Sequence, residues 1–203
     1  MSLTRRRLLV AGMAAGISSA VRPVFAAAAP AGIFPDLLGR AKAALDRHRG
    51  EIANPDLIAI ADFSRPSHMP RFHLVDVANG RASSHLVAHG RGSDPKHTGW
   101  LERFSNGFGS NATSAGAYRT NGFYVGAHGR SIRLSGLDSS NDNALARGIV
   151  VHGAWYVSPA MAASHGVLGR SEGCFAFSES SLGEILAWLG PGHMIYADKI
   201  NAA

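Results

Sequence analysis

The residues with the clearest chemical potential are a histidine and a cysteine that lie 22 positions apart in the chain. Cys174 is the only cysteine among 203 residues, so it cannot form an intramolecular disulfide. His152 ends the apolar run 149–151 and is followed by Gly153. A thiol becomes a strong nucleophile beside a base or a positive charge. The pair predicts nucleophilic catalysis, and the alternative is a small, inert cysteine in the core.

The residues next to the cysteine fit the needs of acyl transfer. Such a reaction requires backbone donors for an oxyanion and a cavity for the substrate carbonyl. The turn Ser171-Glu172-Gly173-Cys174 can aim the amides of Gly173 and Cys174 at one point. Ser171 is a candidate for holding this loop or the substrate. The histidine could also be an ordinary buried side chain, and Gly173 could merely serve a turn.

Two charged residues, one just before this turn and one within it, act on the thiol in opposite directions. Arg170 is a candidate for binding a carboxylate or for lowering the pKa of the thiol. Glu172 places a negative charge near the sulfur, which raises the thiol pKa unless Arg170 compensates. The alternative is that both side chains are simply exposed to solvent.

Four other histidines are weaker candidates. His165 precedes Cys174 by nine residues and is a rival base, whereas His128 is better suited to a pocket wall. His85 and His89 are four residues apart, a metal-ligand spacing on a helix, but they lie in a strand-like stretch where such residues are ~13 Å apart. We expect no metal site and no cofactor.

The N-terminus has the features of a bacterial export signal. The basic run Arg5-Arg6-Arg7 precedes an uncharged apolar stretch at 8–21, which is shorter than the ~20 residues of a membrane span. Small residues at 26–29 favour cleavage, and the twin arginines favour the route for folded proteins. Residues 1–29 therefore predict a cleaved signal and a periplasmic or secreted protein without a stable membrane span, and the alternative is an uncleaved anchor.

Removing that segment changes the charge balance. Four arginines leave with it, so that 16 basic and 14 acidic side chains remain of the 20 and 14 in the whole chain, a formal charge of about +2. This balance argues against nucleic acid as a partner. The remainder suffices for one domain. We expect a linker and helix at 30–56 and a catalytic domain at 57–203.

Strand patterns dominate that domain, with few helices. Helical spacing is found at 36–49, after 159 and at 178–189. Asn79-Gly80 predicts a hairpin turn between two strands, and Asn121-Gly122 predicts another within 116–125. The long polar segment 91–114 is typical of a loop that lines a site. Further strands are expected at 57–63, 132–134, 148–153, 174–177 and 194–197. The pattern indicates a mainly β or α+β fold.

The segment 128–175 resembles the catalytic domain of the murein L,D-transpeptidases of bacterial cell walls. Members carry a His-Gly and, after a spacer, a Ser-x-Gly-Cys segment, which here are His152-Gly153 and Ser171–Cys174. The flanks 134–137 and 141–147 also resemble a subgroup of the family, and 113–118 does so more loosely. The similarity covers roughly residues 57–197. Many members have a histidine where this chain has Glu172.

The resemblance implies a mixed β-sandwich or partial barrel with peripheral helices, and a cysteine acyltransferase acting on peptidoglycan stem peptides. Cys174 would attack the carbonyl of an L-centre in a tetrapeptide stem and release D-alanine. An amine would then take the thioester to form a cross-link, whereas water would make the enzyme an L,D-carboxypeptidase. Another cysteine peptidase and a non-catalytic cell-wall-binding domain are the alternatives. The implied roles are nucleophile for Cys174, general base for His152, orientation of that base for Gly153, oxyanion donation for Gly173 and Cys174, and pocket shape for Arg170 and Ser171.

Overall fold

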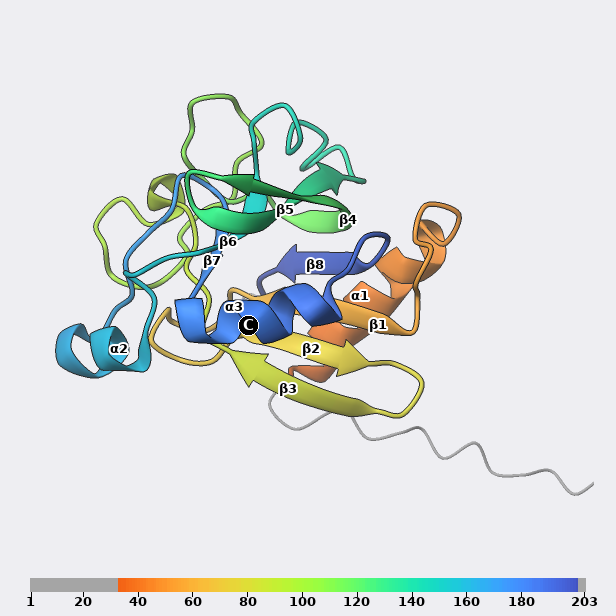
Figure 1. Cartoon of the computed structure of the whole chain (residues 1–203), viewed down its shortest axis with the longest axis horizontal. Helices are drawn as coiled ribbons and strands as arrows, with labels where there is room; N and C mark the ends of the chain where they lie inside the picture. Colours follow the sequence, from red (N-terminus) through yellow and green to blue (C-terminus); the bar gives the residue numbers. More distant parts are fainter. Residues whose placement is uncertain (1–32, 201–203) are drawn as a thin grey trace, which may run out of the picture.

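The computed structural model describes residues 33–200 (Figure 1). The predicted export signal at 1–29 lies outside the described residues. In chain order the elements are α1 (Pro35–Arg47), β1 (Leu57–Asp62), β2 (Phe72–Asp76), β3 (Arg81–His85), the 3-10 turn η1 (Arg91–Ser93), β4 (Gly116–Gly126), β5 (Gly129–Gly136), β6 (Val150–Gly153), α2 (Pro159–His165), β7 (Phe175–Phe177), α3 (Glu179–Trp188) and β8 (Met194–Asp198).

All of these strands form one mixed sheet, which confirms the mainly β, α+β prediction. The strand order is β3-β2-β1-β8-β4-β5-β6-β7. Neighbours are antiparallel except for the pairs β1–β8 and β6–β7, which are parallel. The sheet is not a closed barrel. Its edges nevertheless meet through isolated bridges from Ala88 to Ala176 and from Gly90 to Ser171, which bring the segment after β3 beside the cysteine turn.

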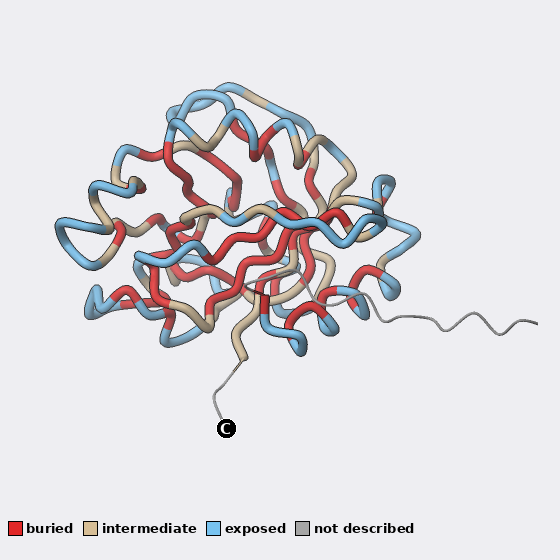
Figure 2. Tube along the Cα trace, turned by 90° about the horizontal axis from the view of Figure 1, so that it is seen from below, coloured by how far each residue is buried: buried red, intermediate tan, exposed pale blue. Residues whose placement is uncertain are grey.

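The two faces of the sheet bury different side chains, as the twofold period of a strand requires. In β1, Ile58 and Ile60 pack with α1 on one face, whereas Ala59 and Ala61 pack with α3 on the other. Figure 1 shows α3 crossing in front of the sheet and α1 behind it. Buried backbone concentrates in the central strands, and exposed backbone lies in the surrounding loops (Figure 2). The helix predicted within a linker region is thus an integral part of the domain.

The predicted turn at Asn121-Gly122 is wrong, because β4 runs through it. Residues Thr120 and Phe123 mark a register shift against β5, so the two residues between them form a bulge. An extra residue in a bulge favours the same residue types as a turn. The actual hairpin turn is Ala127-His128, between β4 and β5. The turn predicted at Asn79-Gly80 is confirmed, with Gly80 at φ +67°.

Both short helices begin where a serine caps them. Ser158 accepts a hydrogen bond from the Met161 amide at the start of α2, and Ser178 accepts one from the Ser181 amide at the start of α3. These caps satisfy amides that a helix start would otherwise leave unpaired. Across residues 33–200, no helix has the length and apolar character needed to cross a bilayer.

Candidate active site

Two adjacent strands bring the histidine and the cysteine close to each other. In the parallel pair β6–β7, His152 is the register partner of Ala176. Cys174 lies two residues before Ala176, in the bend that leads directly into β7. The neighbouring strands are ~4.8 Å apart. The fold therefore brings the backbones of His152 and Cys174 near each other, although 22 residues separate them in the sequence.

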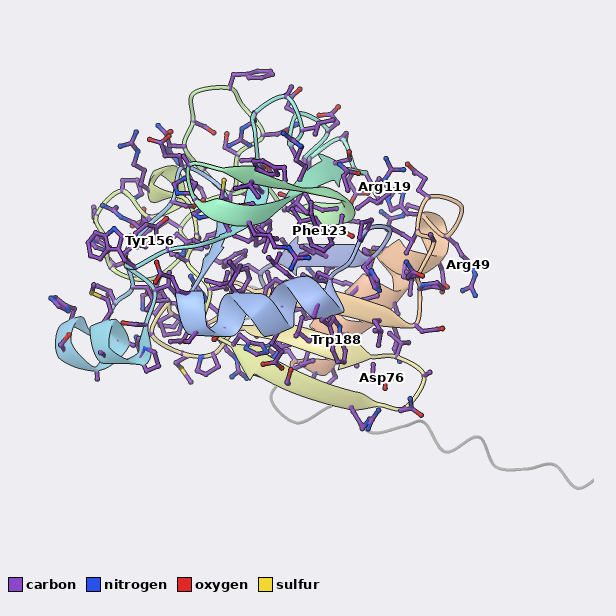
Figure 3. All side chains as sticks on the ribbon, in the orientation of Figure 1. Arg49, Asp76, Arg119, Phe123, Tyr156 and Trp188 are labelled. Carbon is purple, nitrogen blue, oxygen red and sulfur yellow. The ribbon has the colours of Figure 1, made fainter. Side chains whose placement is uncertain are left out.

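Both side chains line a cavity of about 640 Å³. Its wall comes from the 91–114 loop, the β4–β5 hairpin, the start and end of β6, and the cysteine turn. Figure 3 shows Tyr156 where the chain leaves β6 towards α2. The residues around the cavity are Phe108, Gly109, Asn111, Tyr124, His128, Ala146, Arg147, Gly148, Val150, His152, Tyr156, Arg170, Ser171, Glu172 and Cys174.

His152 is held in the form that can accept a proton. Its Nδ1 lies 2.8 Å from the Gly153 carbonyl oxygen. Because a carbonyl only accepts, Nδ1 carries the hydrogen and Nε2 keeps its lone pair. Burial lowers the pKa of His152, and the charge of His128 lowers it further, while the Gly153 hydrogen bond works in the opposite direction. The imidazole is therefore neutral at neutral pH.

Cys174 rests as a protonated thiol. Its Sγ donates to the Gly148 carbonyl at 3.7 Å. Burial raises the pKa of the thiol, and the Glu172 carboxylate raises it as well. A hydrogen bond from the Val150 backbone and the charge of Arg147 lower it. Formation of the thiolate therefore requires a base.

The cysteine turn is braced by its own serine. The Gly173 amide donates to Ser171 Oγ at 3.2 Å, and Ser171 Oγ donates to the Cys174 carbonyl at 2.7 Å. Gly173 has φ +120°, a conformation open to glycine. Because the Gly173 amide is already engaged, the Cys174 amide is the member of the predicted oxyanion pair that remains a candidate donor.

The charges around the thiol differ from the arrangement expected from the sequence. Arg170 donates through Nη1 to the Asp94 and Pro95 carbonyls. Glu172 forms an ion pair of 2.8 Å with Arg91. The cation that lowers the thiol pKa is Arg147.

The other candidate histidines occupy separate places. His128, at the hairpin tip, stacks on His152 and lines the cavity. His165 lies at the end of α2, contacts Ser164, and does not line the cavity. His85 faces Glu184, whereas His89 is buried against Arg71. Within the described part of the chain, no three of His, Cys, Asp and Glu lie close enough together to hold a metal ion.

Sequence reasoning missed Arg147 at the cavity and Arg91, the partner of the cavity residue Glu172. Arg147 lies in the stretch 141–147 that carries the resemblance, but its proximity to Cys174 depends on the chain path between β5 and β6. Arg91 reaches Glu172 only because the edges of the sheet meet. A spacing rule could not have found either residue.

A sequence model of the L,D-transpeptidase catalytic domain matches residues 32–197. This chain belongs to the L,D-transpeptidase catalytic-domain family. The match includes α1, so the helix is part of the family's domain. No curated protein matches the chain.

Several solved L,D-transpeptidases are similar in structure. An enzyme from Mycobacterium smegmatis is 15% identical, covers 70% of this chain over 58% of its own length, and gives a TM-score of 0.43. L,D-transpeptidase 3 from Mycobacterium tuberculosis, in complex with a faropenem-derived adduct, has 15% identity, coverage of 70% and 60%, and a TM-score of 0.45. A protein from Xylanimonas cellulosilytica has 16% identity, coverage of 77% and 68%, and a TM-score of 0.38. The chain thus spans less than two thirds of the first two neighbours.

Proposed function

We propose that this L,D-transpeptidase domain cross-links peptidoglycan by cysteine acyl transfer through a thioester. The observation that carries the proposal is that His152 in β6 and Cys174, one residue before the neighbouring strand β7, line one cavity. The imidazole has an available Nε2, and the thiol needs a base to ionise. His152 can therefore supply the base that Cys174 needs in order to act as a nucleophile.

In the first half-reaction, His152 Nε2 takes the proton of Cys174. The sulfur bonds to the carbonyl carbon of an L-centre in a tetrapeptide stem, and the Cys174 amide donates to the resulting oxyanion. The C–N bond then breaks, and the imidazolium returns its proton to the departing D-alanine amine. The product is a thioester on Cys174 and free D-alanine.

In the second half-reaction, an amine of a neighbouring stem attacks the thioester. His152 takes a proton from this amine, the C–S bond breaks, and the sulfur regains the proton. Attack by water instead gives a shortened stem, which is the L,D-carboxypeptidase alternative. Arg170, whose Nη1 is held by two carbonyls, presents a guanidinium at the same cavity and is suited to the terminal carboxylate of the stem.

The decisive experiment incubates the full chain with a tetrapeptide donor, with and without an amine acceptor, followed by mass spectrometry of products. We expect a cross-linked dimer with the acceptor, and none with Cys174→Ala or His152→Ala. His165→Ala is the matched histidine control, because His165 lies outside the cavity, and it should keep full activity. Shortened stems alone would favour the hydrolase. Activity that survives Cys174→Ala would refute a thiol mechanism.

A covalent probe tests the same assignment without a donor. A carbapenem should add its mass to Cys174, the only cysteine of the chain. No adduct under reducing conditions would contradict the proposal. A chelator should leave acylation unchanged, whereas loss of activity on chelation would indicate a metallohydrolase.

We also propose that the protein works in the cell envelope after export by residues 1–29. The basis is the twin-arginine run followed by an uncharged stretch. Replacing Arg6 and Arg7 by lysine should retain the precursor in the cytoplasm, as measured by cell fractionation. Unchanged export and processing of this variant would contradict the twin-arginine route.

A further inference from the structure

Arg147 has a rigid backbone next to the strand that carries His152. Its amide donates to the Asn143 carbonyl at 2.8 Å, and the Ile149 amide donates to the Ala144 carbonyl at 2.9 Å. Ala144 is fully buried. The side chain of Arg147 therefore starts from a fixed point at the entry to β6.

The guanidinium binds the loop across the cavity at four points. Nη1 donates to the Ser105 carbonyl at 2.9 Å and to Ser114 Oγ at 2.8 Å. Nη2 donates to Ser110 Oγ at 3.3 Å and to the Ala112 carbonyl at 2.5 Å. All four acceptors lie within residues 105–114. One side chain thus ties both ends and the middle of this loop to the segment that leads into β6.

The same guanidinium lies against the cysteine turn. A Cβ added to Gly173 would stand 3.1 Å from Arg147 Nη2 and 2.8 Å from the Ala112 carbonyl oxygen. Thr113 completes the contact, because its hydroxyl accepts from the Gly90 amide at 2.9 Å and donates to the Gly173 carbonyl at 3.3 Å. The loop, the guanidinium and the cysteine turn form one packed unit.

The charge of Arg147 is not neutralised by a carboxylate. Its four acceptors are carbonyl and hydroxyl oxygens, and no ion pair found within residues 33–200 includes it. Neutral ligands fix a cation in place without cancelling its field. By contrast, Glu172 beside the thiol is already paired with Arg91.

We propose that Arg147 is a positioning residue that holds the 105–114 loop and the Gly173-Cys174 turn together and supplies the fixed positive charge that favours the Cys174 thiolate. The inference rests on the proposed function in taking Cys174 as the nucleophile. The lowering of the thiol pKa by Arg147 is consistent with it. The other ionisable groups that share the cavity with the thiol are Glu172 and Arg170 of its own loop, His152 of β6, Tyr156 after β6, and Tyr124 and His128 of the hairpin.

The test is the pH dependence of alkylation by iodoacetamide, which reads the single thiol of the full chain. Arg147→Met should slow alkylation at pH 7 by at least about threefold and move the profile to higher pH. Arg147→Lys, which keeps the charge, should stay within about twofold of wild type. Arg103→Met is the matched control, since Arg103 donates to the Gly92 carbonyl and does not line the cavity. An Arg147→Met profile that superimposes on the wild-type profile would overturn the proposal.

A second measurement, on Arg147→Lys, tests the proposal even if Arg147→Met does not fold. A lysine ammonium has three donors and cannot satisfy four separated acceptors. In Arg147→Lys, hydrogen exchange of the 105–114 amides should therefore quicken, while exchange in β1 and β8 stays as in wild type. Unchanged exchange at 105–114 would overturn the holding role. The two proposals can fail separately. If alkylation of Cys174 differs between wild type and Arg147→Met as expected, but the wild-type protein transfers no acyl group, the proposed function fails and this inference stands.

Discussion

The imidazole of His128 stacks on that of His152, with ring centroids 4.2 Å apart and planes inclined by 25°. His128 occupies the tip of the β4–β5 hairpin, so a turn far from the cysteine in sequence covers the proposed base. The contact buries one face of the His152 ring. Together with the charge of His128 it lowers the pKa of His152 and keeps that imidazole neutral.

Removal of His128 should shift the pH dependence of acylation. In His128→Ala the His152 pKa rises, because a like charge and part of the burial are lost. The acid limb of the rate of carbapenem acylation should then move slightly to higher pH, and the rate at pH 6 should fall by about twofold at most, because His128 is exposed and its charge is the smallest influence on the His152 pKa. His128→Phe, which keeps a ring but no charge, should shift the limb less. Coincident acid limbs for wild type and His128→Ala would contradict this role.

Glu172 should raise the pKa of the Cys174 thiol only slightly. Its side chain is 72% exposed and pairs with Arg91, so solvent and the arginine screen its charge. Glu172→Gln should lower the Cys174 pKa and raise the rate of iodoacetamide alkylation at pH 7, by about twofold at most. Glu102→Gln, a charge change outside the cavity, is the control. A slower reaction in Glu172→Gln would mean that the carboxylate assists ionisation.

The sequence was sufficient for most of the strands and for the hairpin at Asn79-Gly80. It also indicated that His152 and Cys174 share a site; both line one cavity, and their catalytic roles stay a prediction. Local patterns encode strands and turns because they depend on side-chain alternation and on φ preferences. Asn121-Gly122 misled because a bulge and a turn favour the same residues. Arg91 and Arg147 were missed because their contacts depend on how the edges of the sheet meet and how a loop crosses the cavity. Such long-range contacts leave no local signature in one sequence.

Buried histidines should make the fold sensitive to acid. His73 is 1% exposed in β2, and burial lowers its pKa from 6.5 to about 4. Between these values the unfolded chain binds the proton and the folded chain does not, so stability falls as pH drops from about 6.5 to about 4. In His73→Gln, the loss of unfolding free energy between pH 7 and pH 4.5 should shrink by on the order of 2 kcal/mol.

Urea titrations at the two pH values measure this difference. His68→Gln is the matched control, because His68 is exposed and should leave the pH dependence as in wild type. Burial also lowers the pKa of His89, so that His89 keeps part of the acid sensitivity in either variant. An equal loss of unfolding free energy in wild type and His73→Gln would exclude His73 as a source of the acid sensitivity.

Gly173 should tolerate no side chain. In Gly173→Ala the new Cβ would meet the Ala112 carbonyl oxygen at 2.8 Å and Ile149 Cδ1 at 2.9 Å, at a φ of +120°. The backbone strain alone costs about 1–3 kcal/mol. Relief of the clash must move the cysteine turn away from Ala112, Ile149 and Arg147, and the Cys174 thiol moves with it. We expect a lower melting temperature and a loss of carbapenem acylation of more than about tenfold, the scale of a displaced catalytic group.

Gly166→Ala is the control that separates the effect of backbone strain from the effect of moving the cysteine turn. Gly166 also has a positive φ, +69°, but a Cβ there meets nothing within 4 Å. It caps α2 outside the cavity, so its substitution should lower the melting temperature and leave acylation unchanged. If Gly173→Ala acylated as fast as Gly166→Ala, the position of the cysteine turn against the 105–114 loop would not matter for reactivity. Because Gly173 packs against Ala112 and Arg147, we expect Gly173→Ala to be acylated more slowly than Gly166→Ala.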